Sequence, residues 1–260
     1  ETTSLNYMAA EVVGVSFAVE AGAAAYVPLA HDYPGAPDQL QRDVVLEALK
    51  PLLEDEHVAK VGQHLKYDAN VLANHGITLR GIHEDTMLES YVIDSAGSRH
   101  DLDTLALKYL GQRTIHFEDI AGKGAKQLTF NQVPIEQAAP YAAEDAEVTL
   151  RLHQQLSEKL EQAPALSALY RELEIPLVPV LSRIERNGAL VCRDTLAAHS
   201  QACSRRHTSR SRRRARRHRT RCRSGSAPSC RSRCSSCRWP CRRGTPSRSW
   251  CCRRRTPRCR

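Results

Sequence analysis

The sequence predicts an α/β fold in which helices flank a sheet. Strand-like runs come first, at residues 12–19 and 24–29, and from residue 59 onward a short strand is followed by helical stretches. Strands followed by helices in this way are typical of layered α/β domains. No apolar run reaches the roughly 18 residues needed to cross a bilayer, so we expect no membrane partner and a cytoplasmic location.

The first two predicted strands form a hairpin, because residues 20–23 have turn character between two strand-forming runs. A third short strand, residues 59–62, leads directly into a helix that closes at Gly76. Each predicted helix has apolar side chains at helical spacing. These helices lie at residues 43–53, 65–74, 86–93, 102–110, 135–160 and 173–185. We expect Pro140 to interrupt the fifth of them.

Charge and cysteine content divide the chain into an acidic body and a basic tail. Residues 203–260 hold 22 of the 38 Lys and Arg side chains and no Asp or Glu, which leaves 16 basic and 29 acidic side chains in the body. All ten cysteines lie at or beyond Cys192, and a cysteine-free body suits a reducing cytosol. The formal charge of +9 therefore averages two unlike segments and does not by itself indicate nucleic-acid binding.

The tail, residues 200–260, has three interpretations. From Cys203 onward it lacks Leu, Ile, Val, Met, Phe and Tyr, so it has no side chains from which to build a core. It could be a phosphate-neutralising arm, or a zinc site made from the closely spaced Cys230, Cys234, Cys237 and Cys241. It could also be an out-of-frame translation, since a one-base shift turns common Leu codons into Cys or Trp and Glu or Lys codons into Ser or Arg. We favour the third, assign the tail no function and expect it to be disordered.

Three acidic positions carry the candidate chemistry. Glu1 opens a Glu-x-x-Ser-Leu segment before the hairpin, and Asp68 follows Tyr67 near the start of a helix. Asp145 follows Tyr141 by four residues, so these two share one face of a helix. Each position alone is weak evidence for a functional site, because an isolated Asp early in a helix is usually a solvated residue. Their order along the chain is the informative feature.

In that order the three positions resemble the motifs of the DEDD exonuclease superfamily, which are Asp-x-Glu, a Tyr-Asp near a helix start, and Tyr-x-x-x-Asp. Longer segments are similar to the bacterial DNA polymerase I family. These segments are residues 52–56, 60–63, 85–91, 128–132, 141–146 and 176–188. The resemblance covers residues 1 to about 196 and stops where the composition changes.

The resemblance implies a ribonuclease H-like fold, which is a mixed sheet flanked by helices. It places a 3′→5′ exonuclease domain at residues 1–165, the start of a helical polymerase thumb at 166–199 and the tail at 200–260. It also implies proofreading of DNA: mismatched nucleotides are removed from a single-stranded 3′ end. The parent protein is then expected to be a monomer that extends primer–template DNA in replication and repair.

The chemistry of this family explains the acidic residues. Two divalent cations can stabilise both the attacking and the leaving oxygen in phosphodiester hydrolysis, and hard Mg²⁺ or Mn²⁺ requires carboxylate oxygens. The resemblance makes Glu1, Asp68 and Asp145 the expected ligands. Tyr141 is expected to orient the attacking water, because a phenol with a pKa of about 10 keeps its proton. The family's fourth carboxylate lies two residues before Glu1, outside the chain, so we expect this chain alone to be inactive.

The resemblance also implies contacts to DNA. Leu5 and Phe117 correspond to apolar contacts on the terminal bases, although ordinary core packing is the alternative. His64 stands where many members of the family have Asn. The other positions expected along the same strand are Gln63, Tyr67, Met87 and Arg99. Stacking and backbone contacts tolerate any base, as a proofreading enzyme requires.

Two other functions stay open from the sequence. A stand-alone exoribonuclease of the ribonuclease D kind shares the Tyr-type motif, but the thumb-like segment at residues 176–188 argues against it. A non-catalytic scaffold would have lost the carboxylates, and the three acidic positions argue against that reading.

Overall fold

A computed structural model describes residues 1–97 and 99–205 of the chain. The chain divides into two compact units, and the first runs from Glu1 to Ala189. In the second unit, which begins at Leu190, residues 193–205 are helical and exposed. What the sequence predicts for the tail after residue 205, including disorder and a cysteine zinc site, lies outside the described residues.

Two two-stranded sheets form the β part of the first unit. Their strands are β1 (Gly14–Glu20), β2 (Ala23–Pro28), β3 (Lys60–Gly62) and β4 (Ile82–Asp85). β1 and β2 form the predicted antiparallel hairpin, and β3 pairs with β4 in parallel. The predicted α/β class is confirmed, and both strand orientations of a mixed sheet are present, although in two separate ladders.

The helices account for most of the first unit. They are α1 (Arg42–Glu54), α2 (Leu65–Asn74), α3 (Thr86–Ile93), α4 (Leu102–Leu105), α5 (Phe117–Ala121), α6 (Ile135–Glu161), α7 (Pro164–Leu169) and α8 (Ile175–Asn187). One π-helical turn, η1 (Ala106–Leu110), continues α4, and another, η4 (Tyr170–Glu174), precedes α8. α1, α2 and α3 begin and end within one residue of the predicted limits. No described helix is both long and apolar enough to span a membrane.

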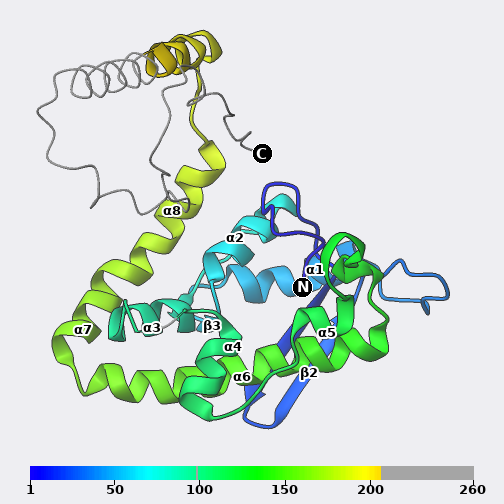
Figure 1. Cartoon of the computed structure of the whole chain (residues 1–260). Coiled ribbons are helices and arrows are strands. Elements are labelled where there is room, and N and C mark those ends of the chain that lie inside the picture. Colours follow the sequence, from blue (N-terminus) through cyan, green and yellow to red (C-terminus); the bar gives the residue numbers. More distant parts are fainter. Residues whose placement is uncertain (98, 206–260) are drawn as a thin grey trace, which may run out of the picture. The chain divides into compact units, whose positions relative to one another are not determined.

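The long helix α6 corrects one prediction. The helix continues through Pro140, where an interruption was predicted from the sequence. Proline in a helix interior costs about 3 kcal/mol. That cost is outweighed because α6 buries an apolar stripe that includes Ala142, Val148 and Leu152, and it packs along both strands of the hairpin (Figure 1).

Two buried clusters position the candidate site. In the first, Val13 of the N-terminal region packs with Phe130, which precedes α6, and with Ala142 of α6, and Tyr141 lies against this cluster. In the second, Val12 and Leu29 pack with Val71 of α2. The hairpin region therefore holds α6 on one side and α2 on the other.

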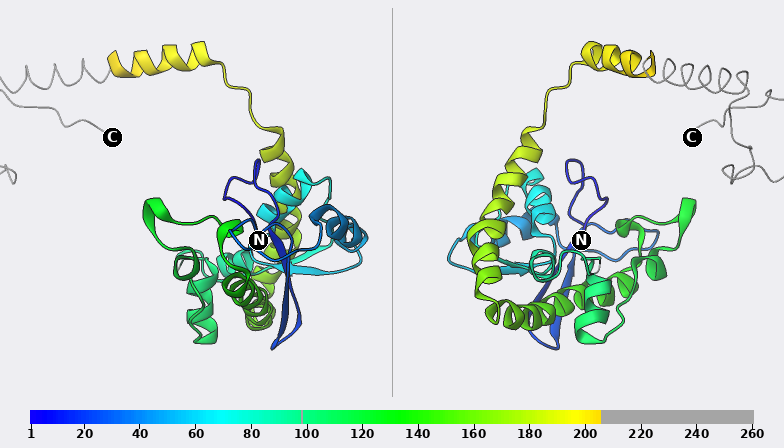
Figure 2. Two further views of the ribbon diagram at one scale, coloured as in Figure 1. Left: turned by 90° about the vertical axis from the view of Figure 1, so that its right-hand side faces the viewer. Right: turned by 60° about the vertical axis from the view of Figure 1, so that its left-hand side comes forward.

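Helix α8 packs against α2 and β4 within the same unit (Figure 2). Asn70 of α2 is fully buried, and Ser182 donates a hydrogen bond to its side-chain oxygen at 2.7 Å. Arg186 donates to the backbone oxygen of Asn70 at 2.8 Å. The boundary at residue 165 between an exonuclease and a polymerase domain stays a prediction.

Candidate active site

The three predicted carboxylates come from three separate parts of the first unit. Asp68 lies in the first turn of α2 and Asp145 lies on α6. Glu1 is fixed by its backbone: its amino group donates to the oxygen of Gly14 at 2.8 Å, and its carbonyl accepts from the amide of Val13 at 2.8 Å. The N-terminal residues are thus hydrogen-bonded to the chain at the start of the hairpin.

The side chains of Glu1, Asp68 and Asp145 interact electrostatically. Burial raises the pKa of Asp68 to about 7, opposed by the N-terminal ammonium and reinforced by the Glu1 carboxylate. Burial, followed by the Glu1 carboxylate, raises the pKa of Asp145 to about 8. Because the negative charge of Glu1 acts on both aspartates, the three acids form one electrostatically coupled cluster.

Tyr141 belongs to the same cluster. The pKa of Tyr141 is raised, first by burial and then by the negative charges of Asp145 and Glu1. A phenol hydroxyl that keeps its proton donates to a carboxylate. The protonated Tyr141 hydroxyl is therefore a hydrogen-bond donor that interacts electrostatically with Asp145 and Glu1.

One buried side chain sets the position of α2. The carboxylate of Asp85, at the end of β4, accepts backbone N–H bonds from His64 at 3.1 Å and Leu65 at 2.8 Å. It also accepts from Met87 at 3.0 Å and Leu88 at 3.3 Å. Asp85 thus satisfies the open amides at the start of both α2 and α3. Asp85 was not predicted to be important from the sequence, although an Asp directly before a predicted helix is an N-cap signal.

The predicted DNA-contact residues near α2 are engaged with the chain itself. The Tyr67 hydroxyl donates to the backbone oxygen of Ser4 at 2.5 Å and lies 2.5 Å from the Thr2 hydroxyl. Gln63 donates to the backbone oxygen of His100 at 2.8 Å. His64 has a positive φ of 66° and its ring centroid is 6.3 Å from that of Tyr67. Burial lowers the pKa of His64.

The remaining predicted contact residues differ in their surroundings. Leu5 is 93% exposed, so it does not pack in the core. Phe117 begins α5 and stacks on Phe130 with ring centroids 6.3 Å apart, and it is also 6.3 Å from the ring of Tyr141. Met87 lies in the first turn of α3. Arg99 is exposed and pairs with an acidic neighbour, Asp101, at 2.9 Å.

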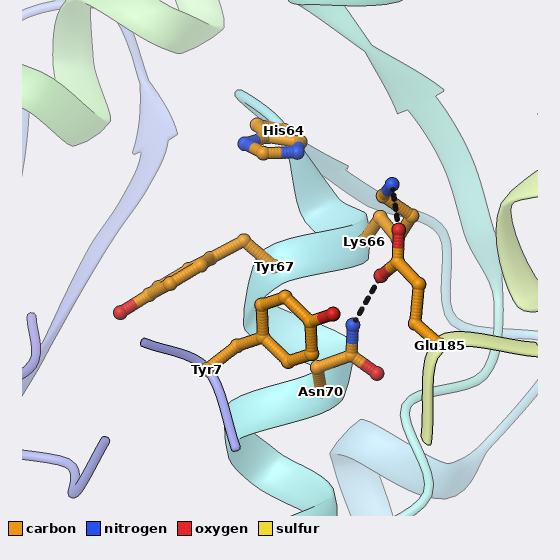
Figure 3. A pocket seen from close by; sticks show the side chains of 6 residues that line it. All are labelled: Tyr7, His64, Lys66, Tyr67, Asn70 and Glu185. Carbon is orange, nitrogen blue, oxygen red and sulfur yellow. Dashed lines mark hydrogen bonds and ion pairs between the residues drawn. The ribbon is translucent and has the colours of Figure 1, made fainter. Parts of the chain in front are cut away.

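A small pocket of about 60 Å³ opens beside α2 (Figure 3). It is lined by Tyr7, His64, Lys66, Tyr67, Asn70 and Glu185. Glu185 of α8 bridges two of these, accepting from Lys66 Nζ at 2.5 Å and from Asn70 Nδ2 at 3.0 Å. His64 and Tyr67 were predicted from the sequence, whereas Lys66 and Tyr7 were not; the contact of Lys66 to α8 has no local sequence signal.

A second acidic group lies apart from the predicted residues. Burial raises the pKa of Glu89 to about 7, and a hydrogen bond from His153 opposes this shift. The same hydrogen bond raises the pKa of His153. Glu84 lies in this group as well. None of the three was singled out from the sequence.

Comparison with known proteins decides the family. Residues 1–161 match the family model described as 3′-5′ exonuclease. The chain belongs to this family. The match includes the N-terminal segment, α2 and α6, and so all four members of the cluster at Glu1, Asp68, Tyr141 and Asp145.

The curated relatives of this exonuclease chain are much longer proteins. DNA polymerase I of Pseudomonas aeruginosa is 67% identical over 203 residues, which cover 77% of this chain and 22% of the relative. DNA polymerase I of Rhizobium leguminosarum is 45% identical over 214 residues, 76% of this chain and 21% of the relative. The chain therefore spans about a fifth of their length. A match to 77% of the chain is longer than the exonuclease model, so the similarity to these polymerases continues beyond α6.

Solved structures agree with this fold. Brucella melitensis NrnC superposes with a TM-score of 0.52 at 20% identity, covering 72% of this chain and 82% of that one. At this identity the likeness shows the fold alone.

Proposed function

We propose that this chain is the proofreading 3′→5′ exonuclease domain of a bacterial polymerase of the DNA polymerase I type. It hydrolyses the last phosphodiester bond at a single-stranded DNA 3′ end, within a protein that also extends primer–template DNA. The observation that carries the proposal is the match of residues 1–161 to the 3′-5′ exonuclease family, and the electrostatic coupling of Glu1, Asp68 and Asp145 supports it. The family match and the similarity to polymerases beyond α6 support DNA as the substrate.

The same cluster fits a pair of divalent cations, Mg²⁺ or Mn²⁺. The carboxylates of Asp68 and Asp145 have raised pKa values, first because of burial and further because acidic neighbours repel them. Bound cations would remove that repulsion, and oxygen-only donors suit hard cations. Glu1, Asp68 and Asp145 would hold them. The chemistry supplied there is stabilisation of charge on the phosphoryl, attacking and leaving oxygens.

The neighbouring side chains do the positioning. Tyr141 keeps its proton at neutral pH, since burial raises its pKa, and so it can hold the attacking water by a hydrogen bond. Phe117 and Tyr67 offer aromatic faces on which any base can stack. We further propose that Leu5, Gln63, His64, Met87 and Arg99 contact the same strand. We also propose that the protein is a monomer and acts on bacterial DNA in the cytoplasm.

The test substitutes Asp145→Asn, which keeps the shape of the side chain and removes its charge. Glu158→Gln, an exposed acid on the same helix, is the matched control. In the chain itself, Mn²⁺ binding is measured by electron paramagnetic resonance. In the intact polymerase that the proposal implies, release of mononucleotides from a labelled single strand is measured together with primer extension.

We expect Asp145→Asn to lower Mn²⁺ affinity and to reduce the exonuclease rate by roughly 100-fold or more, with primer extension unchanged. Glu158→Gln should leave all three readings at wild-type values. Equal exonuclease rates in the two variants would overturn the assignment of Asp145. Faster digestion of RNA than of DNA would favour the stand-alone ribonuclease, and no Mn²⁺ binding by the wild type would favour the scaffold.

A further inference from the structure

Three side chains with metal-binding groups meet outside the proposed catalytic cluster. Glu84 of β4, Glu89 of α3 and His153 of α6 each offer one ligand atom, and these atoms all lie within 4.8 Å of one another. We propose that these three residues form a structural zinc site. The proposal does not depend on the exonuclease activity.

Unpartnered oxygens are the second observation. Glu89 is 0% exposed and Glu84 is 4% exposed. One oxygen of each is engaged: His153 Nδ1 donates to Glu89 at 2.8 Å, and Glu84 Oε1 lies 3.0 Å from His83 Nδ1 and accepts from Arg171 at 3.2 Å. The other oxygen, Oε2 in both residues, has no hydrogen-bond partner within the part of the chain that the structure describes. A buried polar atom without a partner costs about 1–3 kcal/mol, and more when charged. Two such atoms in one group of potential ligands support a cation bound at this group.

The donor set favours zinc. Two carboxylates and one imidazole form a mixed oxygen and nitrogen set, whereas Mg²⁺ prefers oxygen alone. Tetrahedral zinc with bonds of about 2.0–2.2 Å separates its ligand atoms by about 3.4 Å, so side-chain shifts of about 1 Å would close the site. His153 has a side chain that is 20% exposed, which gives the ion an entrance and leaves a fourth position for water. Zinc would displace the proton between His153 and Glu89, and Arg171 would stay on Glu84.

The location gives the ion a structural role. β4 ends at Asp85, which fixes the start of α2 and thereby Asp68. α6 carries Tyr141 and Asp145 as well as His153. One ion bound to β4, α3 and α6 would therefore hold together the elements that carry the catalytic cluster.

The experiment is a Zn²⁺ titration of the whole chain by calorimetry, after its cysteines have been carbamidomethylated so that thiols do not bind the metal. Excess Mg²⁺ is present to occupy the carboxylates of Asp68 and Asp145. The test variants are Glu89→Gln and His153→Gln. Matched controls are Glu118→Gln and His116→Gln, because Glu118 and His116 also form ion pairs but are exposed and lie outside the group.

We expect one Zn²⁺ per wild-type chain and a loss of affinity of roughly 100-fold or more in both test variants, with the controls unchanged. Zn²⁺ should also raise the melting temperature of the wild type and not that of His153→Gln, a reading that remains if Glu89→Gln fails to fold. The inference is overturned if the alkylated wild type binds no Zn²⁺, or if both test variants bind it as the controls do. Loss of the zinc in Asp145→Asn alone would also overturn it, because the ion would then belong to the catalytic cluster.

Discussion

Replacing Asp85 by Asn should destabilise the fold more than any other single isosteric change near the cluster. The side chain is 1% exposed and accepts four backbone N–H bonds, two at the start of α2 and two at the start of α3. Asn keeps one acceptor oxygen. With that oxygen in the place of Oδ1, which accepts from His64, Met87 and Leu88, the amide nitrogen would face the N–H of Leu65, which bonds to Oδ2 and would lose its partner.

The magnitude follows from the bonds lost. A hydrogen bond to a charged group contributes about 1.5–3 kcal/mol, so the one lost bond, from Leu65, costs about 1.5–3 kcal/mol, and the three remaining bonds to a neutral oxygen are weaker. Relief of a buried charge offsets part of this, since burial raises the pKa of Asp85 despite the four amides. We expect a net loss of about 2 kcal/mol. The shift at the start of α2 should also weaken Mn²⁺ binding through Asp68.

The assay is urea unfolding followed by circular dichroism. Asp101→Asn is the control, because Asp101 caps α4 through a single backbone amide, that of Thr104, at 3.1 Å. Asn is a good residue at an ordinary N-cap, so this control should cost less than about 1 kcal/mol. A loss of stability in Asp85→Asn no larger than that in Asp101→Asn would refute the reasoning.

Two further predictions concern the fold around the site. Burial lowers the pKa of His31 below 6.5 in the folded chain, so below about pH 6.5 the unfolded chain binds a proton that the folded chain does not, and stability falls. The fall between pH 7 and pH 5, measured by urea unfolding, should be smaller in His31→Gln, and equal falls would contradict this. A Cβ at Gly81 (φ 66°) would lie 2.4 Å from the backbone oxygen of Val58, whereas one at Gly111 (φ 65°) would meet nothing within 4 Å. Gly111→Ala should cost about 1–2 kcal/mol and Gly81→Ala about 2 kcal/mol more, and equal melting temperatures would exclude the proposed clash.

Strong local signals explain which elements were predictable. Helix α2 begins and ends at the predicted residues, because a strand precedes it and Gly76, with φ at 73°, follows it. The strand β4 was missed, since its sequence Ile-His-Glu-Asp lacks an alternating apolar pattern and depends on pairing with β3. Pro140 was misread, because local propensity says nothing about the packing that α6 gains along the hairpin.

Some residues of the candidate sites could likewise be predicted from local sequence, and others could not. Asp68, Tyr141 and Asp145 stand in recognisable motifs, so their roles could be proposed from the sequence. The group formed by Glu84, Glu89 and His153 could not, because it depends on α6 crossing near β4 and α3. The bridge from Glu185 to Lys66 likewise exists only because α8 packs on α2.

The central claim is that Glu1, Asp68 and Asp145 hold two divalent cations. The most direct measurement is anomalous X-ray diffraction from crystals of the chain grown with Mn²⁺. The account predicts two manganese peaks about 3.5–4 Å apart, bounded by these three carboxylates and close to the Tyr141 hydroxyl. Manganese bound elsewhere, with none at these carboxylates, would contradict it.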